Sequence, residues 1–158
     1  MKSERDYAAL RRELDEIVNG GEIEIADHAG AIAALASRNP HSIRHLPDPS
    51  KGPYNCFTHA LGLIDSDRVQ RILKRDADWY GFAGIKVGSQ FMVRLIADKL
   101  LVEDAAGELT VYFLDVTPRH AGRVVGGRIQ SKWGIGNLWD HEIWEVPASH
   151  GETAADLG

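Results

Sequence analysis

The chain has 158 residues, of which 44% are hydrophobic and 26% charged, a composition typical of a folded globular protein. This length is enough for one domain with an ordinary hydrophobic core. The 23 acidic residues outnumber the 18 basic ones, so the formal net charge is −5. Because no block of basic residues interrupts this balance, we expect no nucleic-acid partner.

Cysteine usage and the N-terminus bear on where the protein works. The single cysteine cannot form an internal disulfide, unlike the cysteines of a stapled secreted domain. The first residues are charged, and no apolar run follows them as in a signal peptide. No stretch approaches the roughly 18–20 apolar residues of a membrane span. We therefore expect a cytoplasmic protein, with delivery outside the cell by another route left open.

The first 45 residues predict a helical segment that belongs to the same domain as the rest. Residues 3–18 carry an apolar stripe at helical spacing, with Ser3 as the cap. A second helix is predicted from Asp27 to Arg38, where Asn39 and Pro40 end it.

A loop rich in proline follows, over residues 40–53. It contains His41 and His45, but the flanking prolines argue against the helix that would bring two histidines together on a metal. Since no cluster of acidic or cysteine ligands accompanies them, we predict no metal site and no cofactor.

The only cysteine lies where a helix is predicted to start. Gly52 and Pro53 set a turn, and Asn55 is a candidate N-cap for a helix running from Cys56 to Ile64. Free amides and the helix dipole at that end favour a thiolate. The alternative is that Cys56 is a small buried hydrophobe, as most lone cysteines are.

The segment after this helix mixes helical and aromatic patterns. We expect an amphipathic helix over residues 68–75, an aromatic packing cluster formed by Trp79, Tyr80 and Phe82, and a further helix over 89–102. Residues 108–114 then alternate in the manner of a central strand.

Gly126 and Gly127 predict a two-residue β-hairpin between strands 119–125 and 128–133. Val125 then pairs with Arg128, and counting outward predicts which residues share a face of the sheet. One face carries His120, Gly122, Val124, Ile129, Ser131 and Trp133. We expect the cysteine helix to approach this face, so that Cys56 meets His120 as a nucleophile requires. Helices followed by an antiparallel sheet predict an α+β fold.

These segments resemble a known superfamily. Asn55 to Ala60 at the start of a helix, followed by His120 to Val124 at the start of a strand, is similar to the NlpC-type branch of papain-like cysteine peptidases and amidases. Ser131 to Gly134, with His141 beyond, resembles an uncharacterised bacterial and phage group within it. The resemblance covers residues 50–145 and implies a papain-like core over residues 46–147, with the cysteine helix packed against an antiparallel sheet.

The resemblance implies a role for each site residue. Cys56 is the nucleophile, His120 the general base, and Ser131 the third residue, where an amide, carboxylate or imidazole is commoner. Tyr54 or Asn55 helps the Cys56 amide to form an oxyanion hole. Two further histidines remain candidates. His59, three residues after Cys56, is an alternative base, and His141 is a candidate flanking residue whose more ordinary role is in the core.

Two functions follow. The first is an enzyme, a cysteine hydrolase or acyltransferase that acts on an amide or related acyl bond; the placement of the two candidate residues Cys56 and His120 favours it. The second is a catalytically inactive papain-like domain that serves as a binding module, for example in a toxin or phage system, and the serine at position 131 favours it. The oligomeric state stays open. Residues 148–158 are small, polar and acidic, and we expect them to form a flexible tail.

Overall fold

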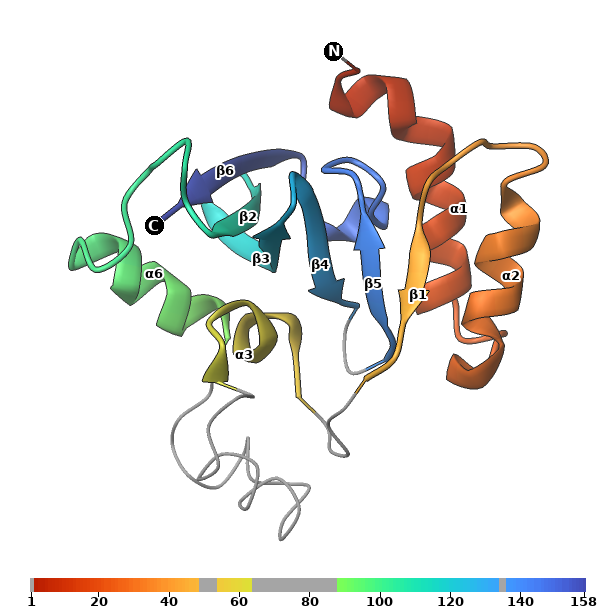
Figure 1. Cartoon of the computed structure of the whole chain (residues 1–158), viewed down its shortest axis with the longest axis horizontal. Helices are drawn as coiled ribbons and strands as arrows, with labels where there is room; N and C mark the ends of the chain where they lie inside the picture. The colour runs from red at the N-terminus through yellow and green to blue at the C-terminus, as the bar shows by residue number, and fades with distance from the viewer. Residues whose placement is uncertain (1, 49–53, 64–87, 134–135) are drawn as a thin grey trace, which may run out of the picture.

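The computed structural model of the chain describes residues 2–48, 54–63, 88–133 and 136–158. The predicted helix 68–75 and the predicted aromatic cluster lie outside the described residues. Within them the fold is α+β, as predicted from the sequence (Figure 1). It is built on a six-stranded sheet in the order β1-β5-β4-β3-β2-β6, and every pair of neighbouring strands is antiparallel.

The strands are β1 (Arg44–Leu46), β2 (Leu109–Leu114), β3 (Thr117–Val125), β4 (Arg128–Lys132), β5 (Leu138–His141) and β6 (Thr153–Leu157). The α-helices are α1 (Ala8–Asn19), α2 (His28–Leu35), α3 (Cys56–Ala60) and α6 (Ser89–Ala97). Within the described residues the 3₁₀ turns are η1 (Glu4–Tyr7), η2 (Ile25–Asp27) and η4 (Ala148–His150). Both predicted N-terminal helices are confirmed, each opening with a 3₁₀ turn.

The hairpin prediction is confirmed in its register. Val125 lies opposite Arg128 and Val124 opposite Ile129, and both loop glycines have positive φ, 59° at Gly126 and 76° at Gly127. Glycine adopts this left-handed conformation without the steric cost that a β-carbon brings. The turn therefore fixes which residues of β3 and β4 share a face.

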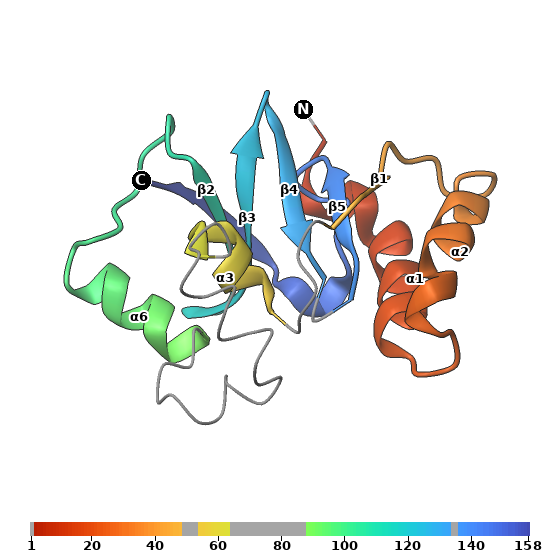
Figure 2. The same cartoon turned by 60° about the horizontal axis from the view of Figure 1, so that its bottom comes forward.

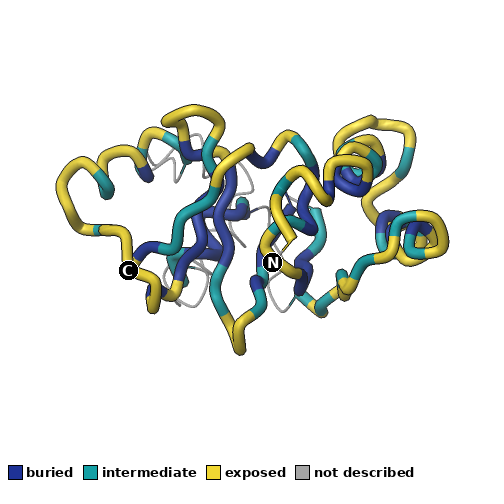
Figure 3. Tube along the Cα trace, turned by 90° about the horizontal axis from the view of Figure 1, so that it is seen from above, coloured by how far each residue is buried: buried dark blue, intermediate teal, exposed yellow. Residues whose placement is uncertain are grey.

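The two faces of the sheet are covered by different helices. Tyr112 and Trp133 belong to one apolar core with residues of α1 and α2. Val111 and Ala121 belong to a second core with residues of α3 and α6. Figure 2 shows α3 and α6 beside β3, and α1 with α2 at the β5 and β1 end. In Figure 3 the buried positions follow the central strands.

The C-terminal residues correct the prediction of a flexible tail. Residues 153–157 form β6, which pairs with β2 from Leu109 opposite Leu157 to Phe113 opposite Thr153. Leu157 is only 3% exposed. The composition of this segment is that of a frayed end, but a long-range partner supplies the backbone hydrogen bonds that hold it.

Candidate functional site

Helix α3 begins at Cys56, as predicted, and is capped by Asn55. The Asn55 side-chain oxygen accepts hydrogen bonds from the Thr58 amide at 3.0 Å and the Thr58 hydroxyl at 3.1 Å. An oxygen acceptor in this position satisfies an otherwise unpaired amide of the first helical turn. The Asn55 side chain is thus used to cap α3, which is a different role from the predicted oxyanion contact.

The surroundings of the Cys56 sulfur are mainly apolar. Cys56 is buried among the side chains of the second core, including Met92, Val111 and Ala121. Burial raises the pKa of the Cys56 thiol to about 11, although the backbone amides of Ala121 and Phe57 act in the opposite direction. Burial thus opposes the thiolate that the helix terminus predicts.

His120 faces away from the cysteine. It lies opposite Tyr112, while the next residue of β3, Ala121, lies opposite Val111. Successive residues of a strand point to opposite faces, so the His120 ring is on the Tyr112 side and Cys56 is on the Ala121 side. The sequence-based register was correct, but α3 packs on the other face of the sheet from the one we expected.

The imidazole of His120 instead joins a buried group of rings. It stacks on His150 of η4 with ring centroids 3.9 Å apart, and it contacts Tyr112. Within the described part of the chain, neither His120 Nε2 nor His150 Nδ1 has a hydrogen-bond partner. Burial, followed by the nearby charges of His150, His141 and His59, holds the pKa of His120 well below its usual range. His120 is thus a neutral packed ring.

Ser131 orients His141 and not His120. His141 Nδ1 lies 2.7 Å from the Glu142 carbonyl oxygen, which can only accept, so Nδ1 carries the proton. The Ser131 hydroxyl therefore donates to His141 Nε2 across 2.6 Å, and it accepts from Trp133 Nε1 at 3.0 Å. Burial lowers the pKa of His141 to about 4, which agrees with a neutral ring. The predicted bond from Ser131 to His120 is replaced by this chain.

Ser131→Ala tests this chain of hydrogen bonds. Removing the hydroxyl leaves two buried nitrogen atoms, one on His141 and one on Trp133, without their partner. We expect the free energy of unfolding to fall by about 2–3 kcal/mol, given the cost of unsatisfied buried groups. Urea unfolding measures this, and Ser37→Ala on the exposed surface is the control. An unchanged midpoint for Ser131→Ala would contradict the assigned role.

Tyr54 belongs to a polar cluster that sequence reasoning missed. The Tyr54 hydroxyl donates to Asp48 at 2.6 Å, and Lys132 Nζ lies 2.7 Å from the other Asp48 oxygen and 3.7 Å from the Tyr54 ring centroid. Lys132 is 3% exposed, so its charge is held by these two contacts. The cluster ties the segment before α3 to β4. The alternation of the strand indicates that Lys132 and Ser131 point to opposite faces of the sheet, but it does not indicate which face α3 covers.

His59, the alternative base, is buried on α3 three residues after Cys56, at 6% exposure. Residues three apart on a helix are neighbours on its surface. Of the predicted site residues, the structure therefore brings Tyr54, Asn55 and His59 near Cys56 along one segment. It separates His120, Ser131 and His141 from Cys56 by the thickness of the sheet.

Comparisons with known proteins add no assignment. No protein-family model matches the chain, and neither the curated proteins nor the solved structures contain a match.

In the described residues, no helix is long and apolar enough to cross a membrane. The same residues contain no group of three or more histidine, cysteine or acidic side chains that could hold a metal ion.

Proposed function

We propose that the chain is a papain-like α+β domain that acts as a binding module and not as a cysteine hydrolase. The observation that carries this proposal is the placement of Cys56 and His120 on opposite faces of β3. A thiol nucleophile needs a base within hydrogen-bond reach, about 3–4 Å for sulfur. The strand itself stands between these two side chains.

The state of the thiol supports the same proposal. With a pKa raised to about 11 by burial, Cys56 carries almost no thiolate at neutral pH. Its contacts are those of a small apolar side chain that fills the space between α3, α6 and the sheet. Cys56 therefore contributes to packing, and the function is carried by a surface or cavity elsewhere on the domain.

A specific observation keeps the cysteine hydrolase or acyltransferase as a second candidate. Cys56 is the first residue of a capped helix, and the amides of Phe57 and Ala121 are directed at its sulfur. Amides in this position can stabilise a thiolate or the oxyanion of an acyl-transfer intermediate. In this reading His59, on the same helix, replaces His120 as the base.

Alkylation by iodoacetamide separates the two functions, because the chain has only one thiol. For the binding module we expect Cys56 to react more slowly at pH 7 than free cysteine, whose pKa is about 8.5. His120→Gln and His59→Gln should leave this rate unchanged. The urea-unfolded protein, in which the thiol is fully accessible, provides the upper reference rate.

The opposite result would support the hydrolase. A folded-state rate far above that of free cysteine, lost in either histidine variant, would show that an imidazole activates the thiol. The variant that loses the rate would then identify the base. Circular dichroism of each variant shows whether the fold is retained, so that a loss of rate is not mistaken for unfolding.

A further inference from the structure

A cavity of about 500 Å³ opens on the side of the sheet away from Cys56, between η1, β2, the β3–β4 hairpin, β6 and the segment that follows β5. Its volume is in the usual range for small-molecule sites. Tyr7, Thr110 and Ile129, all less than a tenth exposed, line it, with Val124 and Ile143 as further apolar residues. The cavity therefore combines buried polar groups with apolar side chains.

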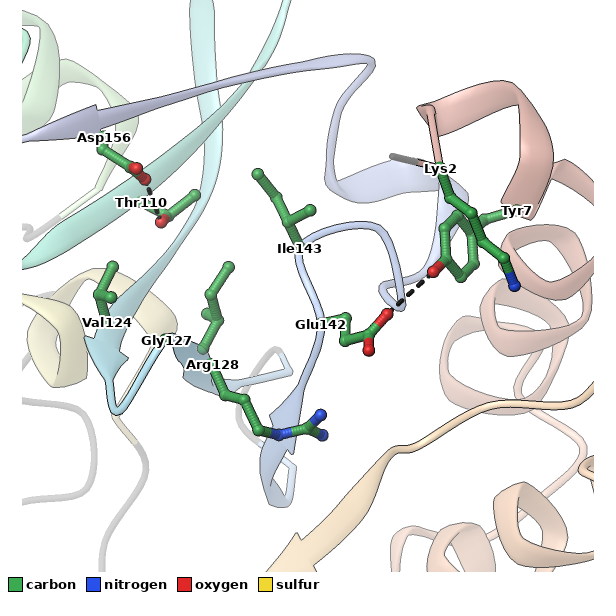
Figure 4. Close-up of a pocket in the computed structure, with 10 residues that line it drawn as sticks. Lys2, Tyr7, Thr110, Val124, Gly127, Arg128, Glu142, Ile143 and Asp156 are labelled. Carbon is green, nitrogen blue, oxygen red and sulfur yellow. Dashed lines mark hydrogen bonds between the residues drawn. The ribbon is translucent and has the colours of Figure 1, made fainter. Parts of the chain in front are cut away.

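Two carboxylates line this cavity at different sides. Figure 4 shows Asp156 beside Thr110 at one side and Glu142 facing Tyr7 at the other, with apolar side chains between them. The Thr110 hydroxyl donates to Asp156 at 2.6 Å, and the Tyr7 hydroxyl donates to Glu142 at 2.9 Å. Each bond holds one carboxylate oxygen, so both carboxylates are positioned by partners that are themselves buried.

Tyr7 remains a hydrogen-bond donor over the whole physiological pH range. Burial raises its pKa to about 12, and the hydrogen bond to Glu142 and the charge of that carboxylate act in the same direction. A protonated phenol keeps donating its hydrogen bond to the Glu142 carboxylate and holds that side chain in place.

Neither carboxylate forms an ion pair within the described residues. Two cationic residues also line the cavity, but both are engaged elsewhere. The Arg128 guanidinium bonds Asp140 and Ser42, and the exposed Lys2 ammonium lies 5.6 Å from the Tyr7 ring centroid. The cavity thus presents two carboxylates that are separated by apolar side chains. Neither Arg128 nor Lys2 forms an ion pair with them.

We propose that this cavity binds a small aliphatic diamine, one ammonium group at Glu142 and the other at Asp156, with the hydrocarbon chain against Val124 and Ile143. The proposal rests on the binding function proposed above and assigns a ligand class to it. An ammonium donates charge-assisted hydrogen bonds to a carboxylate, and burying methylene groups against apolar side chains adds to the affinity. A ligand with one charge satisfies only one of the two carboxylates.

Isothermal titration calorimetry with α,ω-diaminoalkanes of three to eight carbons tests the proposal. Because Tyr7 and Thr110 hold the carboxylates, we expect one chain length to bind most tightly. 1-Aminobutane should bind at least about tenfold more weakly, since a charge-assisted contact is lost. Glu142→Gln and Asp156→Asn should each weaken the best diamine by a similar factor, because the amide oxygen still accepts from Tyr7 or Thr110 while the charge is removed.

Glu152→Gln is the matched control, since it removes an exposed carboxylate that does not line the cavity. It should leave the dissociation constant unchanged. Failure of every diamine to bind, or equal binding by the monoamine and by both amide variants, would overturn the inference. Alkylation of Cys56 remains a separate test of the binding-module proposal. Slow alkylation without diamine binding would overturn the ligand class alone, so the two failures are distinguishable.

Discussion

Arg11→Met is expected to lower the free energy of unfolding by about 3–5 kcal/mol, the usual cost of breaking a buried, hydrogen-bonded charge network. Arg11 is 2% exposed, and its guanidinium donates to the carbonyl oxygens of Val146 at 3.1 Å and Gly151 at 2.5 Å. It also pairs with Glu4 at 2.6 Å and lies over the Trp144 ring.

The large effect follows from what Arg11 holds together. Its contacts join α1 to the segment on either side of η4, which carries His150 and leads into β6. Methionine fills a similar volume but leaves these carbonyl oxygens and Glu4 without their donor. Urea unfolding measures the loss, and the neighbouring exposed Arg12→Met should change stability by less than about 0.5 kcal/mol. Equal stability of the two variants would contradict the role of Arg11.

Acid is expected to destabilise the fold through three buried histidines. Burial lowers the pKa of His141 to about 4 and of His150 to about 3, and it holds that of His120 well below the usual 6.5. In the folded state the His141 and His150 rings are neutral at pH 5, whereas the unfolded chain binds a proton at each of them below pH 6.5. The part of the free energy of unfolding that depends on these neutral rings is fully present above pH 6.5. It is lost as the pH falls toward the pKa values of the folded state.

Each such histidine contributes a slope that approaches about 1.4 kcal/mol per pH unit, so His141 and His150 together remove about 3 kcal/mol between pH 6.5 and 5, and His120 acts in the same direction. Most carboxylates stay ionised in this window, which makes the histidines the main cause. Urea unfolding at half-unit steps of pH measures the slope. His150→Phe keeps a ring against His120 and should reduce the slope by the contribution of one proton. A wild-type stability that does not change over this window would contradict neutral burial of the rings.

The parts of the fold that could be predicted from the sequence are those that depend on residues close together in the chain. The Asn55 cap, the Gly126-Gly127 turn and the stripe of α1 each depend on residues a few positions apart, and all three are observed. The face of the sheet that α3 covers is not local. Val111 and Tyr112 are adjacent on β2 and both are fully buried, so the strand pattern alone does not distinguish its two sides.

The candidate site shows the same limit. The helix terminus correctly indicates backbone amides at the Cys56 sulfur. How far burial opposes their effect on the thiol pKa depends on Met92 and Val111, which are distant in sequence. The C-terminal strand is likewise held by β2, and Arg11 bonds Gly151 just before it; the composition of the strand reveals neither partner. Local chemistry could be predicted from the sequence, whereas the balance between opposing effects required the tertiary contacts.

The ionisation of Cys56 tests the central claim most directly. The thiolate absorbs near 240 nm, and because the chain has one cysteine, the difference between wild type and Cys56→Ser reports this group alone. If Cys56 is a packed thiol, this difference stays small through pH 8 and rises only toward the pKa of about 11. A full thiolate signal at pH 6–7, lost in His59→Gln or His120→Gln, would show an activated nucleophile and contradict the account.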